Sequence, residues 1–324
     1  MSELKIFFVF FISFLVILGV TLILPLYPIF EKEPQRELYE PNSHYFKYRE
    51  DNSVLKLLFY RNGNSNTNEK SQTLQCTMMK KPVYKSYYFE CEKSKNIVSV
   101  LDENSKRTNV TNIITFDNDI YALDSSNGIL YEINQQISSL IPRHIFASQA
   151  SNNPYPMNIQ FSFVKDNILH IISNDSTIVA LDDELRTRWG NWTDELSPLF
   201  ENEALSNCSS KRITTMLYLR SSFEFLFLFG DCRTILVTDV EYNVKEKHNV
   251  HSDESVTLQS MKFVPYNEKM LILLASKKNT SKKDMYDSFA FLYDLNNPNK
   301  ATAENVIDKS TQTSSTPYVS FDII

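Results

Sequence analysis

The four cysteines have a spacing that suits disulfide bonds better than metal binding. Their number is even and no two of them form a C-x-x-C pair, which disfavours a zinc cluster. Cys76 and Cys91 lie in the strand-like runs TLQCTMM and YYFECEK, and a hairpin would bring them together. We therefore predict a Cys76–Cys91 and a Cys208–Cys232 disulfide over the other two pairings. Four buried thiols are the alternative.

Five asparagines lie in N-x-S/T sequons, the acceptors of N-linked glycans in secreted proteins. They are Asn109, Asn174, Asn191, Asn207 and Asn279. An Asn- and Ser-rich chain forms such sequons by chance, so they permit secretion without demonstrating it. Together with the cysteines they lead us to expect a glycoprotein of an oxidising compartment.

Several familiar catalytic and ligand-binding patterns are missing from the sequence. Only 5 glycines are present and each stands alone, whereas phosphate-binding loops need clustered glycines. No G-x-S-x-G or H-x-x-x-H pattern occurs, which disfavours a serine nucleophile and a zinc site. Asp117, Asp119 and Asp124 lack the Gly and terminal Glu of an EF-hand, so we interpret them as turn residues. The net charge of −6 disfavours nucleic-acid binding.

Residues 6–30 form an uncharged apolar run that opens IFFVFFISFLVILGVTLIL. At about 1.5 Å per residue, these residues can span a hydrocarbon core about 30 Å thick. The run exceeds the apolar part of a signal peptide and ends in bulky residues, which favours a signal-anchor over a cleaved signal. We expect residues 1–5 to form a short cytoplasmic tail, residues 31–53 a stalk and residues 54–324 a lumenal domain.

After the stalk the sequence consists of short apolar runs separated by Asn, Asp, Ser and Lys. Such runs, rich in β-branched and aromatic types, predict an antiparallel all-β domain. A plan of strand, polar tip and strand recurs from near Phe116, Val164, Ser221 and Val264, about 43 to 57 residues apart. With the segment from Val54 to Leu101, these repeats predict a five-bladed β-propeller whose last strand closes beside the first. A two-sheet sandwich is the alternative.

Four segments resemble the calcium-activated nucleotidases of the apyrase family, in the order found there. They are Val110–Ile133, Phe163–Ile172, Arg188–Trp192 and Ser260–Lys278, and the chain ends in PYVSFDII, similar to the family's Tyr–x–x–acidic ending. The resemblance covers most of the chain after the stalk. It implies a five-bladed propeller with Ca²⁺ in a central tunnel and one N-terminal membrane segment. An unrelated secreted β-protein is the alternative.

The resemblance also implies which residues face the tunnel, one from each blade. The family presents two serines and three glutamates, and the matching positions here are Thr111, Gln160, Thr214, Gln259 and Val319. None of the five carries a charge, whereas Ca²⁺ prefers several oxygen ligands, some of them charged. We therefore expect no intact metal site, no catalytic residue and no cofactor, and Ca²⁺ only if the chain is an active nucleotidase.

These expectations favour a divergent apyrase-like propeller with little or no nucleotidase activity, acting as a binding or interaction module. Its partner would be a lumenal protein, a glycan or a nucleotide-like ligand. The N-terminal helix would hold it to a membrane of the ER, the Golgi or the cell surface. Relatives can dimerise, so a homodimer is one oligomeric state that the sequence leaves open. The alternative is an active calcium-dependent nucleoside diphosphatase that hydrolyses UDP or GDP in the secretory pathway.

Overall fold

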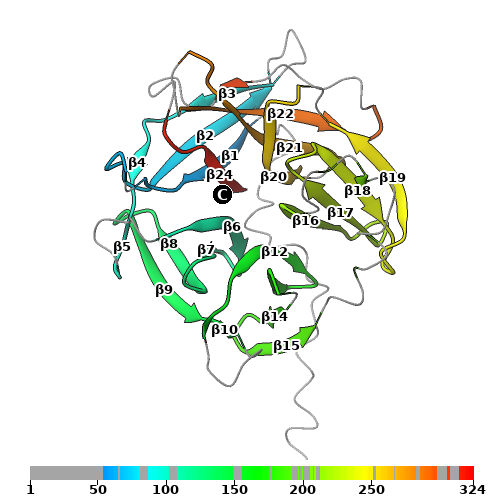
Figure 1. The fold of residues 1–324 in the computed structure, drawn as a ribbon, viewed down its shortest axis with the longest axis horizontal. Coiled ribbons are helices and arrows are strands. Elements are labelled where there is room, and N and C mark those ends of the chain that lie inside the picture. Colours follow the sequence, from blue (N-terminus) through cyan, green and yellow to red (C-terminus); the bar gives the residue numbers. More distant parts are fainter. Residues whose placement is uncertain are drawn as a thin grey trace, which may run out of the picture. The chain divides into compact units, whose positions relative to one another are not determined.

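The short apolar runs form the strands of an all-β structure, a five-bladed β-propeller (Figure 1). The computed structural model describes residues 54–324 apart from 65, 81–86, 102–107, 149–154, 176, 192–195, 197–198, 200–204, 207, 209–211, 251–252, 266, 282–284, 298–304 and 307–313. No helix among the described residues is long and apolar enough to cross a membrane. The expected tail, signal-anchor and stalk (residues 1–5, 6–30 and 31–53) lie outside the described residues.

The first blade joins the two ends of the domain. Its strands, in spatial order, are β24 (Tyr318–Ile323), β1 (Val54–Arg61), β2 (Gln72–Lys80) and β3 (Tyr87–Cys91), with β4 (Lys95–Asn96) also paired to β2. β24 runs antiparallel to β1, with Leu57 opposite Ile323 and Phe59 opposite Phe321. The prediction that the last strand closes the ring beside the first is therefore confirmed.

The other four blades follow in sequence order, each with its first long strand innermost. The second blade consists of β6 (Val110–Phe116), β7 (Asp119–Asp124), β8 (Ile129–Asn134), β9 (Ser139–Ile145) and a short parallel strand, β5 (Val98–Ser99). The third consists of β12 (Ile159–Lys165), β13 (Ile168–Ser173), β14 (Thr177–Leu181) and β15 (Thr187–Asn191). Between them in sequence lies the separate pair β10 (Ala147–Ser148) and β11 (Tyr155–Pro156).

The last two blades have the same plan. The fourth consists of β16 (Thr215–Leu219), β17 (Glu224–Phe229), β18 (Thr234–Thr238) and β19 (Val244–Asn249). The fifth consists of β20 (Val256–Val264), β21 (Asn267–Lys278), β22 (Tyr286–Asp294) and β23 (Asn305–Val306). The predicted blade number is thus confirmed.

The five innermost strands form a closed ring. β24 contacts β6, β6 contacts β12, β12 contacts β16, β16 contacts β20, and β20 contacts β24 again. Figure 1 shows these strands around the centre, with the remaining strands of each blade outside them. A side chain that points inward from any of these strands therefore faces the propeller axis.

Five hydrophobic cores lie between successive blades, so each sheet is apolar on both faces. In β1, for example, Leu57 and Phe59 pack against the fifth blade, whereas Leu58 and Tyr60 pack against the second. Burial of a side chain of this size stabilises the fold by about 1.5–3 kcal/mol. This two-sided burial explains why strands such as β1 and β21 contain continuous apolar runs, whereas β2 and β19, further from the axis, carry polar residues as well.

Asn and Asp residues make the tight turns that glycine makes in many β-proteins. Asp117 and Asn118, between β6 and β7, have φ of 47° and 68°, and Asp166 and Asn167 have φ of 50° and 59°. Two left-handed residues in a two-residue loop suit a hairpin, and Asn and Asp tolerate this conformation. Asp117 is thus a turn residue as predicted. Asp119 and Asp124, from the same motif, begin and end β7.

Both predicted disulfides are present. Cys76 in β2 stands opposite Cys91 in β3, with their Cα atoms 4.0 Å apart. Cys208 is bonded to Cys232, with the Cα atoms 5.0 Å apart. The alternative of four free thiols is wrong, since no cysteine of the chain is free.

Candidate functional site

The five positions implied by the sequence resemblance line one cavity at the propeller axis, with a volume of about 410 Å³. Thr111, Gln160, Gln259 and Val319 come from the inner strands β6, β12, β20 and β24, and Thr214 comes directly before β16. The structure therefore brings all five together. The other lining residues are Asn62, Asn109, Val110, Ser125, Arg212, Ile213, Asp231, Thr257 and Leu258.

A β-bulge directs each of these positions. In β6, Val110 pairs with Asp124 and Asn112 pairs with Leu123, so Thr111 is an extra residue without a partner across the ladder. A bulge of this kind bends the strand and redirects the extra side chain. Thr111 is placed by this irregularity at the cavity wall.

The same irregularity recurs in every blade. Gln160, Gln259 and Val319 are each skipped by the pairing of their own strand with its neighbour. In the fourth blade the Thr214 N–H donates to the Leu228 oxygen at 2.8 Å, although Thr215 is the residue paired with Leu228. One bulge residue from each of five blades therefore points to the axis.

The polar side chains at these positions are held by hydrogen bonds to the protein. The Gln160 Nε2 donates to the backbone oxygen of Ile213 at 3.0 Å, which joins the third blade to the fourth. The Gln259 Nε2 donates to the Ser276 Oγ at 2.8 Å. Because one amide hydrogen of each is used in this way, each carboxamide has a fixed orientation, with its carbonyl oxygen left to accept a further bond.

Gly230 makes a close approach between the fourth and fifth blades at the cavity wall. Its N–H donates to the Thr214 Oγ1 at 3.1 Å, and its oxygen accepts from the Leu258 N–H at 3.0 Å. A Cβ at this position would lie 2.0 Å from the Leu258 oxygen. Only glycine permits this contact.

Among the lining residues that the structure describes, one is acidic and one is basic, Asp231 and Arg212. The other described side chains of the wall are neutral, and hydroxyls and carboxamides supply most of their polar atoms. Ca²⁺ sites in proteins use six to eight oxygen ligands, several of them carboxylates. Among the described lining residues only Asp231 offers a carboxylate, which is fewer charged oxygen ligands than such a site uses. Among the residues that the structure describes, no cluster of three or more His, Cys, Asp or Glu side chains could hold a metal ion.

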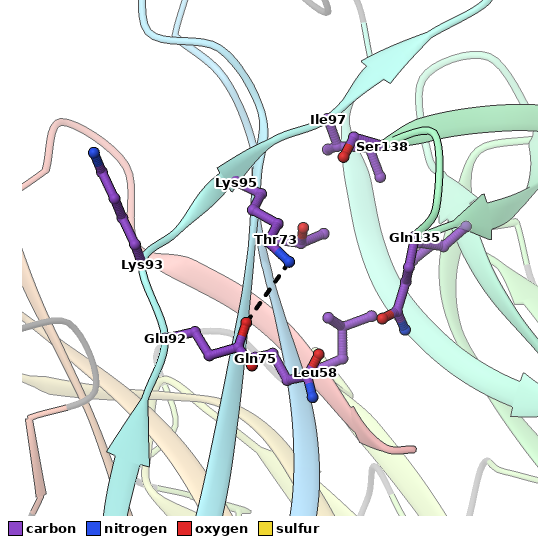
Figure 2. Close-up of a pocket in the computed structure, with 10 residues that line it drawn as sticks. Leu58, Thr73, Gln75, Glu92, Lys93, Lys95, Ile97, Gln135 and Ser138 are labelled. Carbon is purple, nitrogen blue, oxygen red and sulfur yellow. Dashed lines mark ion pairs between the residues drawn. The ribbon is translucent and has the colours of Figure 1, made fainter.

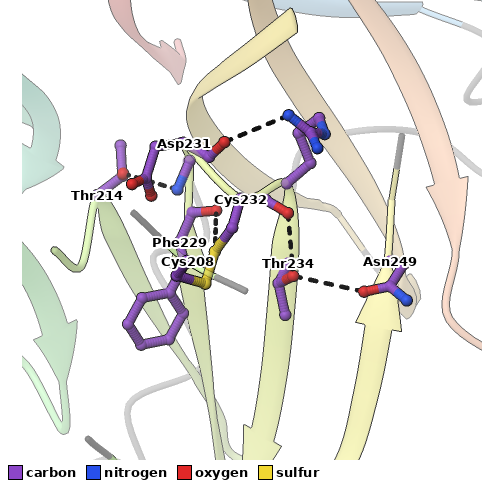
Figure 3. The surroundings of a disulfide bond; sticks show 9 residues. Cys208, Thr214, Phe229, Asp231, Cys232, Thr234 and Asn249 are labelled. Atoms are coloured by element: carbon purple, nitrogen blue, oxygen red, sulfur yellow. Dashed lines mark hydrogen bonds between the residues drawn. A yellow bond between two sulfur atoms is a disulfide. The ribbon is translucent and has the colours of Figure 1, made fainter. Parts of the chain in front are cut away.

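Arg212 and Asp231 were not expected from the sequence, and the Cys208–Cys232 disulfide ties together the segments that carry them. Figure 3 shows Asp231 next to Cys232, with Thr214 close by. On the other side of the disulfide, the backbone oxygen of Cys232 accepts a hydrogen bond from the Thr234 Oγ1 at 3.1 Å. The nearness of Arg212 to Thr214 in the sequence was a signal that could have pointed to it.

Asn62, also missed by sequence reasoning, attaches the first blade to the cavity wall. Its side chain donates to the Val110 oxygen and accepts from the Val110 N–H, both at 2.8 Å. The adjacent Asn109 donates from its Nδ2 to the Ser125 Oγ at 2.9 Å. These bonds fix the segment that enters β6.

An ion pair between the inner strands lies further along them from the bulges. The Lys262 Nζ of β20 lies 3.0 Å from the Asp322 Oδ2 of β24, and both side chains are nearly buried. The Thr115 N–H of β6 also donates to the same oxygen at 2.6 Å. Asp322 therefore links the fifth, first and second blades.

A second hollow lies between the first two blades and is only about 20 Å³ in volume (Figure 2). Lys95 and Glu92 form an exposed ion pair of 3.6 Å at its edge. A space of this size accommodates about one water molecule. It is therefore no candidate for a ligand site.

The predicted glycosylation residues lie in different surroundings. Asn109 and Asn174 are exposed, and Asn279 is half-buried, with its Nδ2 donating to the Asp287 Oδ2 at 2.9 Å. Asn191 ends β15, and Asn207 lies outside the described residues. Of these five, only Asn109 is among the residues that line the described part of the cavity.

The fold and the central cavity define a five-bladed propeller with one axial pocket. Residues 61–206 match the apyrase family model, which confirms the resemblance to the apyrase family over this part of the chain. The matched part carries Thr111 and Gln160, whereas the other three cavity positions lie beyond it.

Distant similarities to solved structures accompany this match. A protein of unknown function from Bacteroides caccae is 10% identical, with a TM-score of 0.48, over 83% of this chain and 99% of that one. A protein from Lactobacillus plantarum is 7% identical, with a TM-score of 0.40, over 84% and 99%. These values are too low to support an argument about function. No curated protein sequence matches the chain.

Proposed function

We propose that this chain is a divergent apyrase-like propeller that has lost its calcium site and serves as a binding or interaction module with little or no nucleotidase activity. One observation carries the proposal. The five bulge residues that meet in the axial cavity are two threonines, two glutamines and a valine, all uncharged.

The absence of charge at these five positions is the physical reason to expect no calcium site. A divalent cation that clamps phosphate oxygens needs negatively charged ligands to offset the loss of its water shell. Neutral carboxamide and hydroxyl oxygens supply only dipoles, and Asp231 is the single carboxylate on the described wall. The scaffold can persist without the chemistry, because a fold does not by itself preserve an activity.

The proposed location is the lumen of the secretory pathway or the cell exterior, with the N-terminal run as the membrane anchor. The two disulfides support an oxidising compartment, since such bonds are rare in the cytosol.

Phosphate release from UDP, GDP and ADP tests the proposal on the purified chain with Ca²⁺ and with a chelator. We expect no phosphate release that depends on Ca²⁺. Turnover that a chelator and Gln160→Ala both abolish would overturn the proposal, because the cavity would then hold a working metal site. Heat inactivation of the chain provides the background rate.

An active calcium-dependent nucleoside diphosphatase is the second candidate. The apyrase match over residues 61–206 and the presence of Asp231 in the cavity favour it. In that case Asp231→Asn would abolish phosphate release. Asp239→Asn, which removes a half-buried carboxylate in the turn after β18, is the matched control and would leave phosphate release intact.

A further inference from the structure

We infer that the sugar attached to Asn109 is seated in the axial cavity, so that the cavity is a site for the chain's own N-linked glycan. The inference rests on the lumenal location proposed above. Asn109 is exposed, and both it and Thr111, the two defining residues of this sequon, line the cavity.

The attachment atom lies at the cavity wall. The Asn109 Nδ2 is 2.9 Å from the Ser125 Oγ, and Ser125 is itself a lining residue. On glycosylation the Nδ2 loses one proton and bonds to the anomeric carbon of N-acetylglucosamine, whose bond to the pyrophosphate of a lipid-linked oligosaccharide breaks. The remaining N–H can keep its bond to Ser125.

The cavity suits an uncharged, hydrogen-bonding occupant. Its volume of about 410 Å³ is within the range of small-ligand pockets. The carbonyl oxygens of Gln160 and Gln259 offer acceptors to the hydroxyl and acetamido N–H groups of a sugar. The Thr111 hydroxyl donates to the Leu123 oxygen at 3.4 Å, and its own oxygen offers a further acceptor. N-acetylglucosamine is uncharged and needs no charged partner, which agrees with the mostly neutral side chains of the described wall.

The other described sequons lack this setting. Asn174 follows β13 and Asn279 follows β21, and neither lines the described cavity. They provide internal controls.

Site-resolved deglycosylation of the full chain from a glycosylating host tests the inference. Peptide N-glycosidase in ¹⁸O-water marks each released site, before and after denaturation. We expect Asn109 to carry a glycan that is released about tenfold or more slowly from the native than from the denatured chain, a protection of about 1.4 kcal/mol. The glycan of Asn174 should be released equally fast from both.

Cavity variants separate seating in the pocket from general hindrance. Gln160→Ala with Gln259→Ala should speed native release at Asn109, whereas the control Gln75→Ala, on β2 and not among the lining residues of the cavity, should not. Native release at the denatured rate, or an empty Asn109 beside an occupied Asn174, would overturn this inference alone. Empty sequons throughout would overturn it together with the lumenal location.

Discussion

At the scale of single residues, Gly230 shows how tightly the cavity wall is built. Its N–H and oxygen bond to Thr214 and Leu258 in two different blades. An added Cβ would meet the Leu258 oxygen at 2.0 Å and the Thr214 Oγ1 at 2.8 Å. At Gly190 the nearest atom is the Ile178 Cγ2 at 3.0 Å, a side-chain methyl that can yield.

Gly230→Ala should therefore lower the free energy of unfolding by about 1–3 kcal/mol, as overpacking does. Gly190→Ala is the matched control and should have a smaller effect. Urea denaturation followed by tryptophan fluorescence measures both. An equal loss of unfolding free energy in the two variants would mean that the contact between the fourth and fifth blades at Gly230 relaxes to accommodate the added methyl group.

The resemblance implied one inner position in each blade, and the structure places all five of these residues on the wall of one cavity. Arg212 and Asp231 were missed because their place at the wall depends on how far a loop extends before β16 and after β17. The pattern of apolar runs predicts the strands but not the length or path of the loops between them. Asn62 was missed for the same reason, since it lies in the loop after β1 and its side chain bonds to the backbone of Val110 in the second blade.

At the scale of elements, the turns explain how a chain with 5 glycines forms so many hairpins. Within the part of the chain that the structure describes, ten residues other than glycine have positive φ, and four of them are the Asp and Asn pairs described above. Others are poorly suited to this conformation. Phe223, at φ 54° between β16 and β17, is also 63% exposed, so its ring contributes little packing.

Phe223→Gly should raise the free energy of unfolding by about 0.5–1 kcal/mol. Relief of a left-handed conformation gains about 1–2 kcal/mol, and the flexibility of glycine in the unfolded chain offsets part of it. Phe223→Val should instead destabilise, because β-branched residues tolerate positive φ least. Thermal unfolding compares the two, and a stabilising valine would contradict the explanation.

The strands themselves were predictable, whereas the bulges were not. Two-sided burial gives continuous apolar runs such as FEFLFLF, and these runs mark the strands directly. A bulge depends on the count of residues in two paired strands, and Thr111 or Gln259 carries no local sign of being the extra residue. Only the register of the sheets reveals that the cavity is built from five bulges.

At the scale of the whole molecule, ring closure depends on the first blade, which is assembled from both ends of the domain. The repeat spacing predicted this closure and the number of blades. It did not predict the Asp322 contacts, since these join three strands that are far apart in sequence. Asp322 receives hydrogen bonds from Lys262 and from the backbone of Thr115.

Asp322→Asn should lower the free energy of unfolding by about 3–5 kcal/mol, because it leaves the nearly buried Lys262 without its partner. Lys262→Met should cost less, since Asp322 would keep its backbone donors. The double variant should recover part of the loss, with a coupling of about 0.5–3 kcal/mol. Additive losses in a urea-denaturation cycle would refute a stabilising link.

The pairing of β24 with β1 also bears on biosynthesis. The strands of the first blade between residues 54 and 91 leave the ribosome before the other blades, yet the strand that completes their sheet, residues 318–323, is translated after the other four blades. The nascent first blade therefore exposes a hydrogen-bonding edge throughout most of translation, and such edges invite misassociation. A chaperone that shields this edge until synthesis is complete would be of direct benefit to the newly made chain.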